Sequence, residues 1–351
     1  MKTLCIIFGG VSSEHEVSLR SAQTVLENVD RRKFDTHMLG ITKDGRWLYY
    51  DGPTSLIETG KWETSGKVTP AILSPDRSHG GLLILEAQGV RVLPLDVVFG
   101  VLHGKNGEDG TMQGLLELAG IPYVGCGVLA SALCMDKAAA HSVLTGAGIK
   151  KTGLSVVYHR ELEDFTGLER RLAKELGYPM FVKPANSGSS VGVSRAADAR
   201  ELSGALKEAF IHDKKAVVEQ EVKGQEIECS VIGNSDPVSA QVLGEIAPTV
   251  GFYSYQAKYL DDSAKLYIPA HVDEETAAKV RATAEKAYKV MGCAGFARVD
   301  FFVTADGDIL LNEINTIPGF TSISMFPKLF EASGVSCGEL ITRLVEYAIR
   351  R

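Results

Sequence analysis

The chain has 351 residues, a formal net charge of −7, and 45% hydrophobic and 23% charged residues. This length exceeds one small core, so two or three domains are expected. The negative charge argues against a nucleic-acid-binding surface, and no apolar run approaches the ~20 residues that span a bilayer, so neither nucleic acid nor a membrane is an expected partner.

The six cysteines are scattered and form no CxxC pair, which indicates buried free thiols rather than a zinc site or disulfides. The sequence begins directly with a short strand-like segment and shows no features of a signal or transit peptide. We therefore expect a cytoplasmic protein.

Strand and helix signals alternate in the first part of the chain, which is typical of an α/β domain with a parallel sheet. Leu4–Phe8 is a predicted buried strand, and a helix with an apolar face follows it. A second buried strand, Asp96–Leu102, leads into the loop HGKNGEDG at 103–110. The segment 44–90 has hairpin-like and turn-like pieces that the sequence does not assign to elements.

Glu16 lies where the first helix is expected to begin, and two explanations for it stay open. Ser13-x-x-Glu16 fits a capping box, in which Glu16 would reach back to the Ser13 amide. The positive end of the helix dipole would also help to orient a bound ligand there.

The pattern of strand and helix signals changes near 125–127, and a compact α+β unit of roughly a hundred residues follows. Its strand Met180–Lys183 leads into the loop NSGSSVG at 186–192, whose backbone N–H groups could approach phosphate oxygens. The order of residues differs from a Walker A loop, and an ordinary hairpin turn explains the glycines as well. Lys137 is a second candidate cation, although a solvated helix lysine is the usual explanation.

Two further segments could contribute to a ligand site. Glu219 and Glu226 flank the passage into a third unit and could bind adenine and ribose, since clefts between domains are favoured ligand sites; a solvated linker is the competing explanation. The aromatic tract 249–263 is too long for a simple connection and is predicted to be a lid.

The most informative stretch is Arg298–Ser324, RVDFFVTADGDILLNEINTIPGFTSIS. Asp306-Gly307 predicts a two-residue hairpin turn. Counting outward then places Asp300 opposite Glu313 and Arg298 opposite Asn315, on one face. Facing carboxylates repel unless a cation lies between them, and hard oxygen ligands suit Mg²⁺. A solvated polar face is the alternative, but this pattern favours a magnesium–phosphate site.

These motifs, taken together, closely resemble the D-alanine–D-alanine ligases of the ATP-grasp superfamily. The matching segments occur in family order and are HEVSL (15–19), HGKNGEDG (103–110), MDK (135–137), GSSVG (188–192), YQAKY (255–259), ARVDF (297–301) and NEINTIPGFTS (312–322). The resemblance implies a three-domain ATP-grasp α/β architecture with ATP between the last two domains. The expected ranges are an N-terminal parallel-sheet domain at 1–125, a central domain at 126–222 and a C-terminal domain at 223–351 with the lid at 249–263.

The resemblance also implies an activity, in which ATP phosphorylates the carboxylate of one D-alanine and the amine of a second attacks the acyl phosphate. Two Mg²⁺ ions, or Mn²⁺, and a homodimer are expected. By motif correspondence, the resemblance gives Glu16, Ser189, Tyr259 and Arg298 as catalytic; Lys137, Lys183, Ser190, Glu219, Glu226 and Lys258 as ATP-binding; Glu16, His103, Gly319, Ser324 and Met325 as substrate-binding, with Glu108 supporting His103; and Asp300, Glu313 and Asn315 as metal ligands.

Three alternatives remain beside the D-alanine ligase. The first is a family member that makes D-Ala-D-Ser or D-Ala-D-Lac; Tyr259 and the apolar Met325 favour D-alanine at both positions instead. The second is another ATP-grasp ligase, of the glutathione synthetase or biotin carboxylase type, which lacks the HEVSL and lid motifs. The third is a non-catalytic nucleotide sensor, although Lys183 and Arg298 are both retained.

Overall fold

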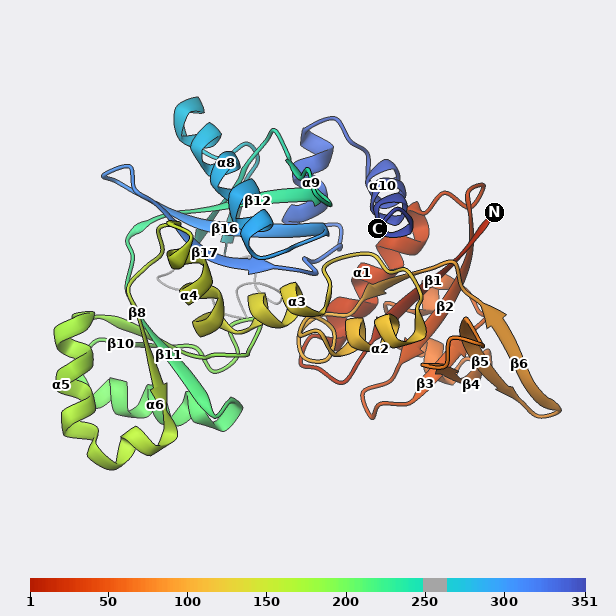
Figure 1. Ribbon diagram of the computed structural model, residues 1–351, viewed down its shortest axis with the longest axis horizontal. Coiled ribbons are helices and arrows are strands. Elements are labelled where there is room, and N and C mark those ends of the chain that lie inside the picture. Colours follow the sequence, from red (N-terminus) through yellow and green to blue (C-terminus); the bar gives the residue numbers. More distant parts are fainter. Residues whose placement is uncertain (249–263) are drawn as a thin grey trace.

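The computed structural model describes residues 1–248 and 264–351, which form three β-sheets in chain order (Figure 1). The predicted α/β architecture is confirmed. The predicted lid at 249–263, with Lys258 and Tyr259, lies outside the described residues. No helix in the two described ranges is both long and apolar enough to cross a membrane.

The first sheet has seven strands in the order β6-β5-β4-β3-β2-β1-β7. The predicted parallel pairing holds for β2, β1 and β7 only. The other strands pair antiparallel. The connections from β2 to β3, from β4 to β5 and from β5 to β6 are too short for a parallel crossover, whereas the longer connection 51–67 joins β3 to β4. The bounds are β1 (Lys2–Gly9), β2 (Phe34–Ile41), β3 (Trp47–Tyr50), β4 (Val68–Leu73), β5 (Gly81–Glu86), β6 (Gly89–Pro94), β7 (Val97–Val101), α1 (His15–Asn28), α2 (Thr111–Ala119), and the 3-10 helices η1 (Thr54–Leu56) and η2 (Lys61–Thr64).

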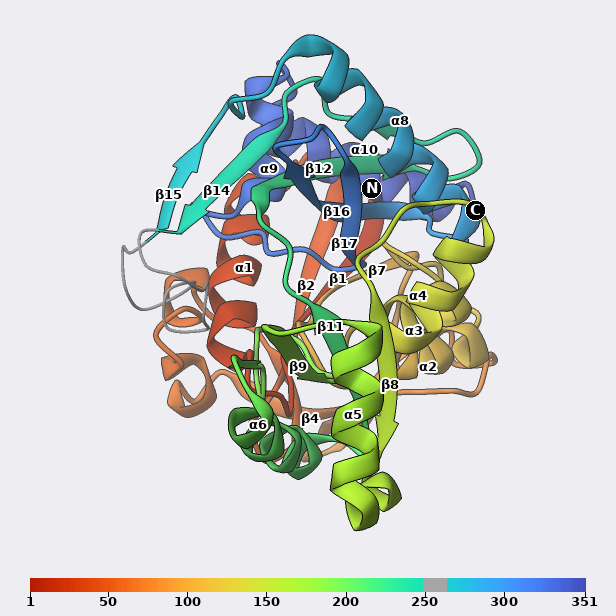
Figure 2. The same ribbon diagram turned by 90° about the vertical axis from the view of Figure 1, so that its left-hand side faces the viewer.

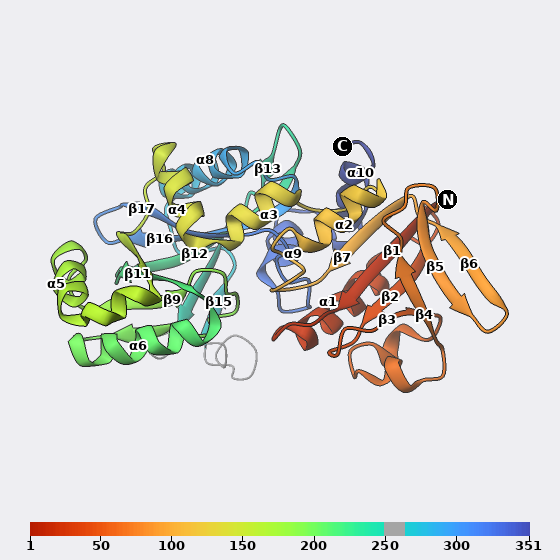
Figure 3. The same ribbon diagram turned by 60° about the horizontal axis from the view of Figure 1, so that its bottom comes forward.

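The segment 44–90, which the sequence left unassigned, supplies the antiparallel part of this sheet and places the β5–β6 hairpin at its outer edge (Figure 3). Alternate residues of β1 face opposite sides of the sheet. Leu4 and Ile6 share a core with Leu19 of α1, whereas Cys5 shares another core with Leu116 of α2. The two helices therefore cover opposite faces.

The second sheet is antiparallel, in the order β10-β9-β11-β8, and has a core of its own (Figure 2). Leu172 of α5 and Leu206 of α6 pack there against Val182 and Val218 of the strands. The glycine loop connects β9 to β10. The bounds are β8 (Leu154–Tyr158), β9 (Met180–Pro184), β10 (Ser194–Ala196), β11 (Lys215–Gln220), α5 (Phe165–Glu175), α6 (Ala199–His212) and the 3-10 helix η3 (His159–Asp164).

The third sheet has the order β15-β14-β12-β16-β17, with β13 paired to β12. Two separate short strands, β13 and β14, lie between 238 and 248, and the short helices α3 and α9, which are rich in apolar residues, were not predicted from the sequence. The bounds are β12 (Gly224–Gly233), β13 (Val238–Ser239), β14 (Gly244–Pro248), β15 (Ala264–Tyr267), β16 (Gly295–Thr304), β17 (Ile309–Asn315), α3 (Val128–Met135), α4 (Lys137–Gly146), α8 (Glu274–Val290), α9 (Met325–Ala332) and α10 (Cys337–Ile349).

The helices α3 and α4 pack with the third sheet, although 126–222 was expected to form a single domain. Cys134 and Leu144 lie in one core with Val299 and Phe301 of β16 and with α8. The helix α3 is almost wholly apolar, which favours this burial. The helix α4 also contacts the second sheet, where Ala138 packs with Ala185 and Val217. The exact domain boundaries stay a prediction.

One continuous core joins the first and third sheets. Phe296 of β16 packs edge-on against Phe99 of β7, with ring centroids 5.9 Å apart, and against Phe320 at 6.0 Å. The helix α10 packs against α1, so the end of the chain lies beside the first sheet (Figure 1). The second sheet takes no part in this core.

The shared core predicts a large loss of stability on truncation of Phe296, which is fully buried. Phe296→Ala should lower the free energy of unfolding by about 3–5 kcal/mol, measured by chemical denaturation. Ile211→Ala, at a side chain 72% exposed, is the control and should change it by less than about 0.5 kcal/mol. Equal effects of the two substitutions would contradict a core that joins the sheets.

Candidate functional site

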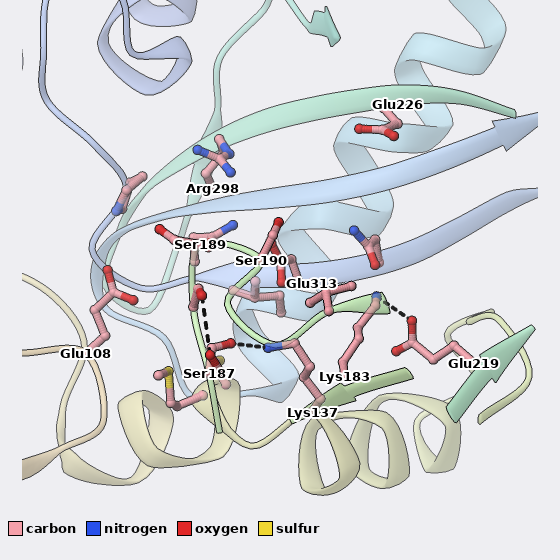
Figure 4. A pocket seen from close by; sticks show the side chains of 18 of the residues that line it. Glu108, Lys137, Lys183, Ser187, Ser189, Ser190, Glu219, Glu226, Arg298 and Glu313 are labelled. Atoms are coloured by element: carbon pink, nitrogen blue, oxygen red, sulfur yellow. Dashed lines mark hydrogen bonds and ion pairs between the residues drawn. The ribbon is translucent and has the colours of Figure 1, made fainter. Parts of the chain in front are cut away.

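A cavity of about 450 Å³ lies where the glycine loop faces β12, β16, β17 and the loops of the first sheet (Figure 4). Side chains from all three sheets point into it. Most of the predicted site residues contribute to its wall: His103, Lys137, Lys183, Ser189, Ser190, Glu219, Glu226, Arg298, Glu313, Asn315 and Gly319, together with Glu108.

The face of the third sheet that forms one wall follows from strand alternation. Val299 and Phe301 point into the core with α8, so Arg298 and Asp300 point to the opposite side. The observed register pairs Arg298 with Asn315 and Asp300 with Glu313. The predicted juxtaposition of these four side chains is therefore confirmed.

The turn that produces this register differs from the prediction. Thr304 pairs with Asp308 across a three-residue loop that ends on Gly307, whose φ is +81°. Phe301 consequently pairs with Leu311, and the register shifts by one residue between Phe301 and Asp300. The predicted two-residue turn is wrong, but the bulge at Asn312 cancels the error.

Arg298 is held by two carboxylates. Its guanidinium donates to both carboxylate oxygens of Asp300, each at 2.8 Å, and its Nε lies 3.1 Å from Oε2 of Glu228. Burial lowers the pKa of Arg298, but the charges of Asp300 and Glu228 raise it well above its usual value. Sequence reasoning missed Glu228, although it shares the β12 face of Glu226 at strand spacing.

The residues expected to bind metal fit a magnesium site only together with a ligand. Among residues 1–248 and 264–351 there is no cluster of three or more His, Cys, Asp or Glu side chains placed to hold a metal. Asp300 also accepts from Asn315 Nδ2 at 2.9 Å. Asp300, Glu313 and the Asn315 carbonyl would supply part of the oxygen set once Arg298 moves off, and Mg²⁺ ordinarily completes its shell with phosphate oxygens and water.

Two lysines line the cavity next to the glycine loop. Lys137, at the start of α4, donates to the carbonyl of Ser187 at 2.6 Å, and Lys183, on β9, pairs with Glu219 at 2.5 Å (Figure 4). Burial lowers the pKa of Lys183, but the neighbouring Glu219 carboxylate raises it above its usual value. Both cations therefore lie where an anionic ligand would enter.

The glycine loop has an unusual backbone. Ser189 and Ser190 have φ values of +49° and +58°, a left-handed backbone conformation that residues other than glycine rarely adopt. Such conformations concentrate at ligand sites, where successive N–H groups can converge on an anion. The loop also reaches the first sheet, because Ser189 Oγ donates to the Glu14 carboxylate.

The structure corrects the placement of Glu16. Its side chain is 54% exposed, pairs with Lys43 and does not line the cavity. The capping box does not form either, because α1 begins at His15 with Glu14 as its N-cap and has no side-chain cap bond. Two residues rotate a helix by about half a turn, so the side chains at positions 14 and 16 point to opposite sides.

Glu14 occupies the place expected for Glu16. It is 7% exposed, lines the cavity and accepts the hydrogen bond from Ser189. Gly104 and Gly188 leave room for it, since a Cβ at either position would lie 2.6 and 3.0 Å from Glu14 Oε2. The sequence signal was the second acid two residues upstream, directly before the helix.

The buried His103 and the partly buried Glu108 form a pair near Glu14. His103 Nδ1 lies 3.0 Å from the carbonyl of Ile317 and 3.5 Å from the Glu108 carboxylate. Burial lowers the pKa of His103, but Glu108 raises it above its usual value. The pair thus connects the first sheet to the loop after β17.

The last two predicted substrate residues do not line the cavity. Met325 is 4% exposed and packs against Gly244, where a Cβ would lie 2.5 Å from its sulfur. Ser324 Oγ accepts from the Thr321 amide at 3.0 Å. A Cβ at Gly319 would meet this hydroxyl at 2.7 Å, so Ser324 lies behind the cavity wall.

The buried acids predict a pH-dependent stability. Burial raises the pKa of Glu108 to about 7, opposed by His103 and reinforced by the charge of Glu14. A raised pKa in the folded state means that ionisation costs stability as the pH rises through about 7. The melting temperature of Glu108→Gln, relative to wild type, should therefore increase from about pH 5 to about pH 8. A difference in melting temperature that stays constant over this pH range would contradict the prediction.

Comparisons with known proteins agree with this geometry. Residues 3–126 match the family described as D-ala D-ala ligase N-terminus, and residues 143–346 match D-ala D-ala ligase C-terminus. The chain is 48% identical to the D-alanine–D-alanine ligase of Acetivibrio thermocellus, over 100% of this chain and 96% of that protein. It is 44% identical to D-alanine–D-alanine ligase A of Salmonella typhimurium, over 99% and 95%.

Solved structures show the same fold. The VanG D-Ala:D-Ser ligase of Enterococcus faecalis superposes with a TM-score of 0.90 at 40% identity, covering 99% of each chain. The D-alanine–D-alanine ligase of Coxiella burnetii gives 0.87 at 34% identity, covering 100% of this chain and 96% of that one. The predicted three-domain ATP-grasp architecture is thereby confirmed, and the chain belongs to the D-alanine–D-alanine ligase family.

Proposed function

We propose that this chain joins two D-alanine molecules in an ATP-dependent reaction that proceeds through an acyl phosphate. The observation that carries the proposal is the convergence, in one cavity, of the glycine loop, two lysines, Arg298 and Glu313. Asp300 does not line this cavity itself but lies directly beside it, paired with Glu313 across the strands and bonded to Arg298. A carboxylate is a poor acylating agent, so its oxygen must become a good leaving group. This set of cations and acids suits phosphoryl transfer to such an oxygen.

The nucleotide would lie between the second and third sheets. Lys137 and Lys183 would contact its phosphates, together with Ser190 of the glycine loop, while Glu219 and Glu226 would hold the nucleoside. Lys183 would exchange its present bond with Glu219 for a phosphate oxygen. Two Mg²⁺ ions, or Mn²⁺, bound by Asp300, Glu313 and Asn315 would neutralise phosphate charge.

The first D-alanine would lie next to the first sheet. Glu14, in place of Glu16, would hold its ammonium group, and Ser189 would keep the Glu14 carboxylate oriented. His103 and Glu108 would support this pocket from behind. The carboxylate of this first D-alanine would attack the γ-phosphate and displace ADP, which gives the acyl phosphate. The amine of the second D-alanine, after losing a proton, would then attack the acyl carbon, and the tetrahedral intermediate would expel phosphate. Arg298 would stabilise the charge on the tetrahedral centre.

Exclusion of water is the remaining requirement, because an acyl phosphate hydrolyses. The segment 249–263 is proposed as the lid, with Lys258 on the phosphates and Tyr259 in hydrogen-bond contact with the first-substrate site. We further propose a cytoplasmic homodimer, the state expected from the family resemblance.

D-serine as the second substrate is the alternative. The VanG D-Ala:D-Ser ligase has a closely similar fold, and the apolar Met325, which favours D-alanine in the sequence, does not line the cavity. Gly319 and Ser324 would receive the carboxylate of either second substrate, so they do not discriminate between the two.

Phosphate release and product mass decide between these activities. With ATP and Mg²⁺, D-alanine alone should release phosphate and yield D-alanyl-D-alanine, and added D-serine or D-lactate should not become the main product. A mixed product in excess would overturn the substrate assignment. Nucleotide binding without D-alanine-dependent phosphate release would favour the nucleotide sensor.

Glu14 and Glu16 provide a matched pair of substitutions. Glu14→Gln removes the proposed partner of the substrate ammonium and should raise KM for the first D-alanine by about 10- to 100-fold, as expected for loss of a charged hydrogen bond. Glu16→Gln, at an exposed side chain paired with Lys43, should leave steady-state kinetics near wild type. The reverse pattern would restore the original assignment to Glu16.

A further inference from the structure

The bulge in β17 decides which side chains face Asp300. The inner part of the hairpin pairs Phe301 with Leu311 and Phe302 with Leu310. Continued without a bulge, this register would place Asn312 opposite Asp300 and Ile314 opposite Arg298. Asn312 is the extra residue that shifts Glu313 and Asn315 into those positions instead.

Lys151 contacts the strand at this bulge. Its ammonium donates to the carbonyl of Leu311 at 3.0 Å and to that of Asn312 at 2.5 Å. Lys151 also forms a parallel bridge with Leu311, and the Leu311 amide donates to the Lys150 carbonyl at 2.9 Å. The segment between α4 and β8 therefore extends the sheet beside β17 at the residues where the ladder is irregular.

Lys151 also lies behind the nucleotide-facing wall of the cavity. A small space there is lined by Lys137, Lys151, Lys183, Glu219 and Glu313. Burial lowers the pKa of Lys151 to about 8, against the charge of Glu219, so the ammonium form predominates at pH 7. A charged donor to two carbonyls is a stronger restraint than a neutral one.

We propose that Lys151 is a positioning residue for the nucleotide–metal site, which fixes the bulge at Asn312 and thereby aligns Glu313 and Asn315 with Asp300 and Arg298. This role rests on the proposed function. Lys151 does not line the main cavity, so it acts through β17 rather than by touching the substrates. Bulges next to active sites commonly change the direction of side chains, and at this bulge the Lys151 ammonium binds two backbone carbonyls.

Lys150 is the matched control. It precedes Lys151 and its side chain also contacts the β16–β17 hairpin, through Asp308 at 2.6 Å, but its side chain is 69% exposed. A surface ion pair of this kind contributes little. Lys150→Met and Lys151→Met thus remove the same charge from adjacent positions, one at the turn and one at the bulge.

The test is calorimetric titration of each purified variant with ADP, once with Mg²⁺ and once with EDTA. Lys151→Met should weaken ADP binding about tenfold or more with Mg²⁺, and much less with EDTA, because the displaced groups are the metal-facing ones. Lys150→Met should match wild type in both conditions. KM for ATP should rise in Lys151→Met while KM for D-alanine stays nearly unchanged.

Two results would overturn the proposal. Equal losses with Mg²⁺ and with EDTA would make Lys151 a direct phosphate cation, and identical behaviour of the two variants would leave it no role at the bulge. If Lys151→Met does not fold, Lys151→Gln and Lys150→Gln are compared in the same way. The ADP titration needs no D-alanine, so its outcome is independent of whether the wild type releases phosphate with D-alanine.

Discussion

The alignment of β16 with β17 is the constraint on which the rest of the site depends. It places Asp300 beside Glu313 and Arg298 beside Asn315, on a face whose reverse side is fixed by the α8 core. A slip of one residue would turn Glu313 into that core and take Ile314 out of it. The Arg298 guanidinium is bonded to Asp300 and balances its charge, which reduces the repulsion between Asp300 and Glu313.

The arrangement of cores explains how the remaining groups reach that face. The first and third sheets share the aromatic cluster around Phe296, so Glu14 and His103 are held at fixed positions relative to Arg298. The second sheet has a separate core and carries Lys183 and the glycine loop. It is linked to the first unit by the hydrogen bond from Ser189 to Glu14, and the segment that leads into β8 is linked to the third sheet by the hydrogen bond from Lys151 to β17. Lys183 and the glycine loop, which are proposed to contact the nucleotide, are therefore on the sheet that does not share the core of the other two.

Much of this could be predicted from the sequence, because local patterns carried the information. Strand alternation and the Asp306-Gly307 signal predicted a hairpin with Asp300 opposite Glu313, which the structure has, and most motif residues line one cavity. The turn length was wrong, and only the bulge at Asn312, which leaves no local signature, restored the outer register. Glu14 was missed because choosing between two nearby acids requires the rotation of α1. Met325 was misplaced because its packing against Gly244 is a long-range contact.

The segment 44–90 and the helices α3 and α4 show a second limit. Short hairpin strands have little periodicity, so β3 and β4 gave no clear signal. The helix α3 is apolar on nearly all sides, which indicates burial but not the sheet against which it is buried. Such assignments depend on tertiary contacts.

The most direct test is a crystal structure with ADP and Mn²⁺, in which anomalous scattering locates the metal. The account predicts density bridging Asp300, Glu313, Asn315 and the phosphate oxygens, with Arg298 displaced from Asp300. A metal bound elsewhere, with Arg298 still hydrogen-bonded to both carboxylate oxygens of Asp300, would contradict the central claim.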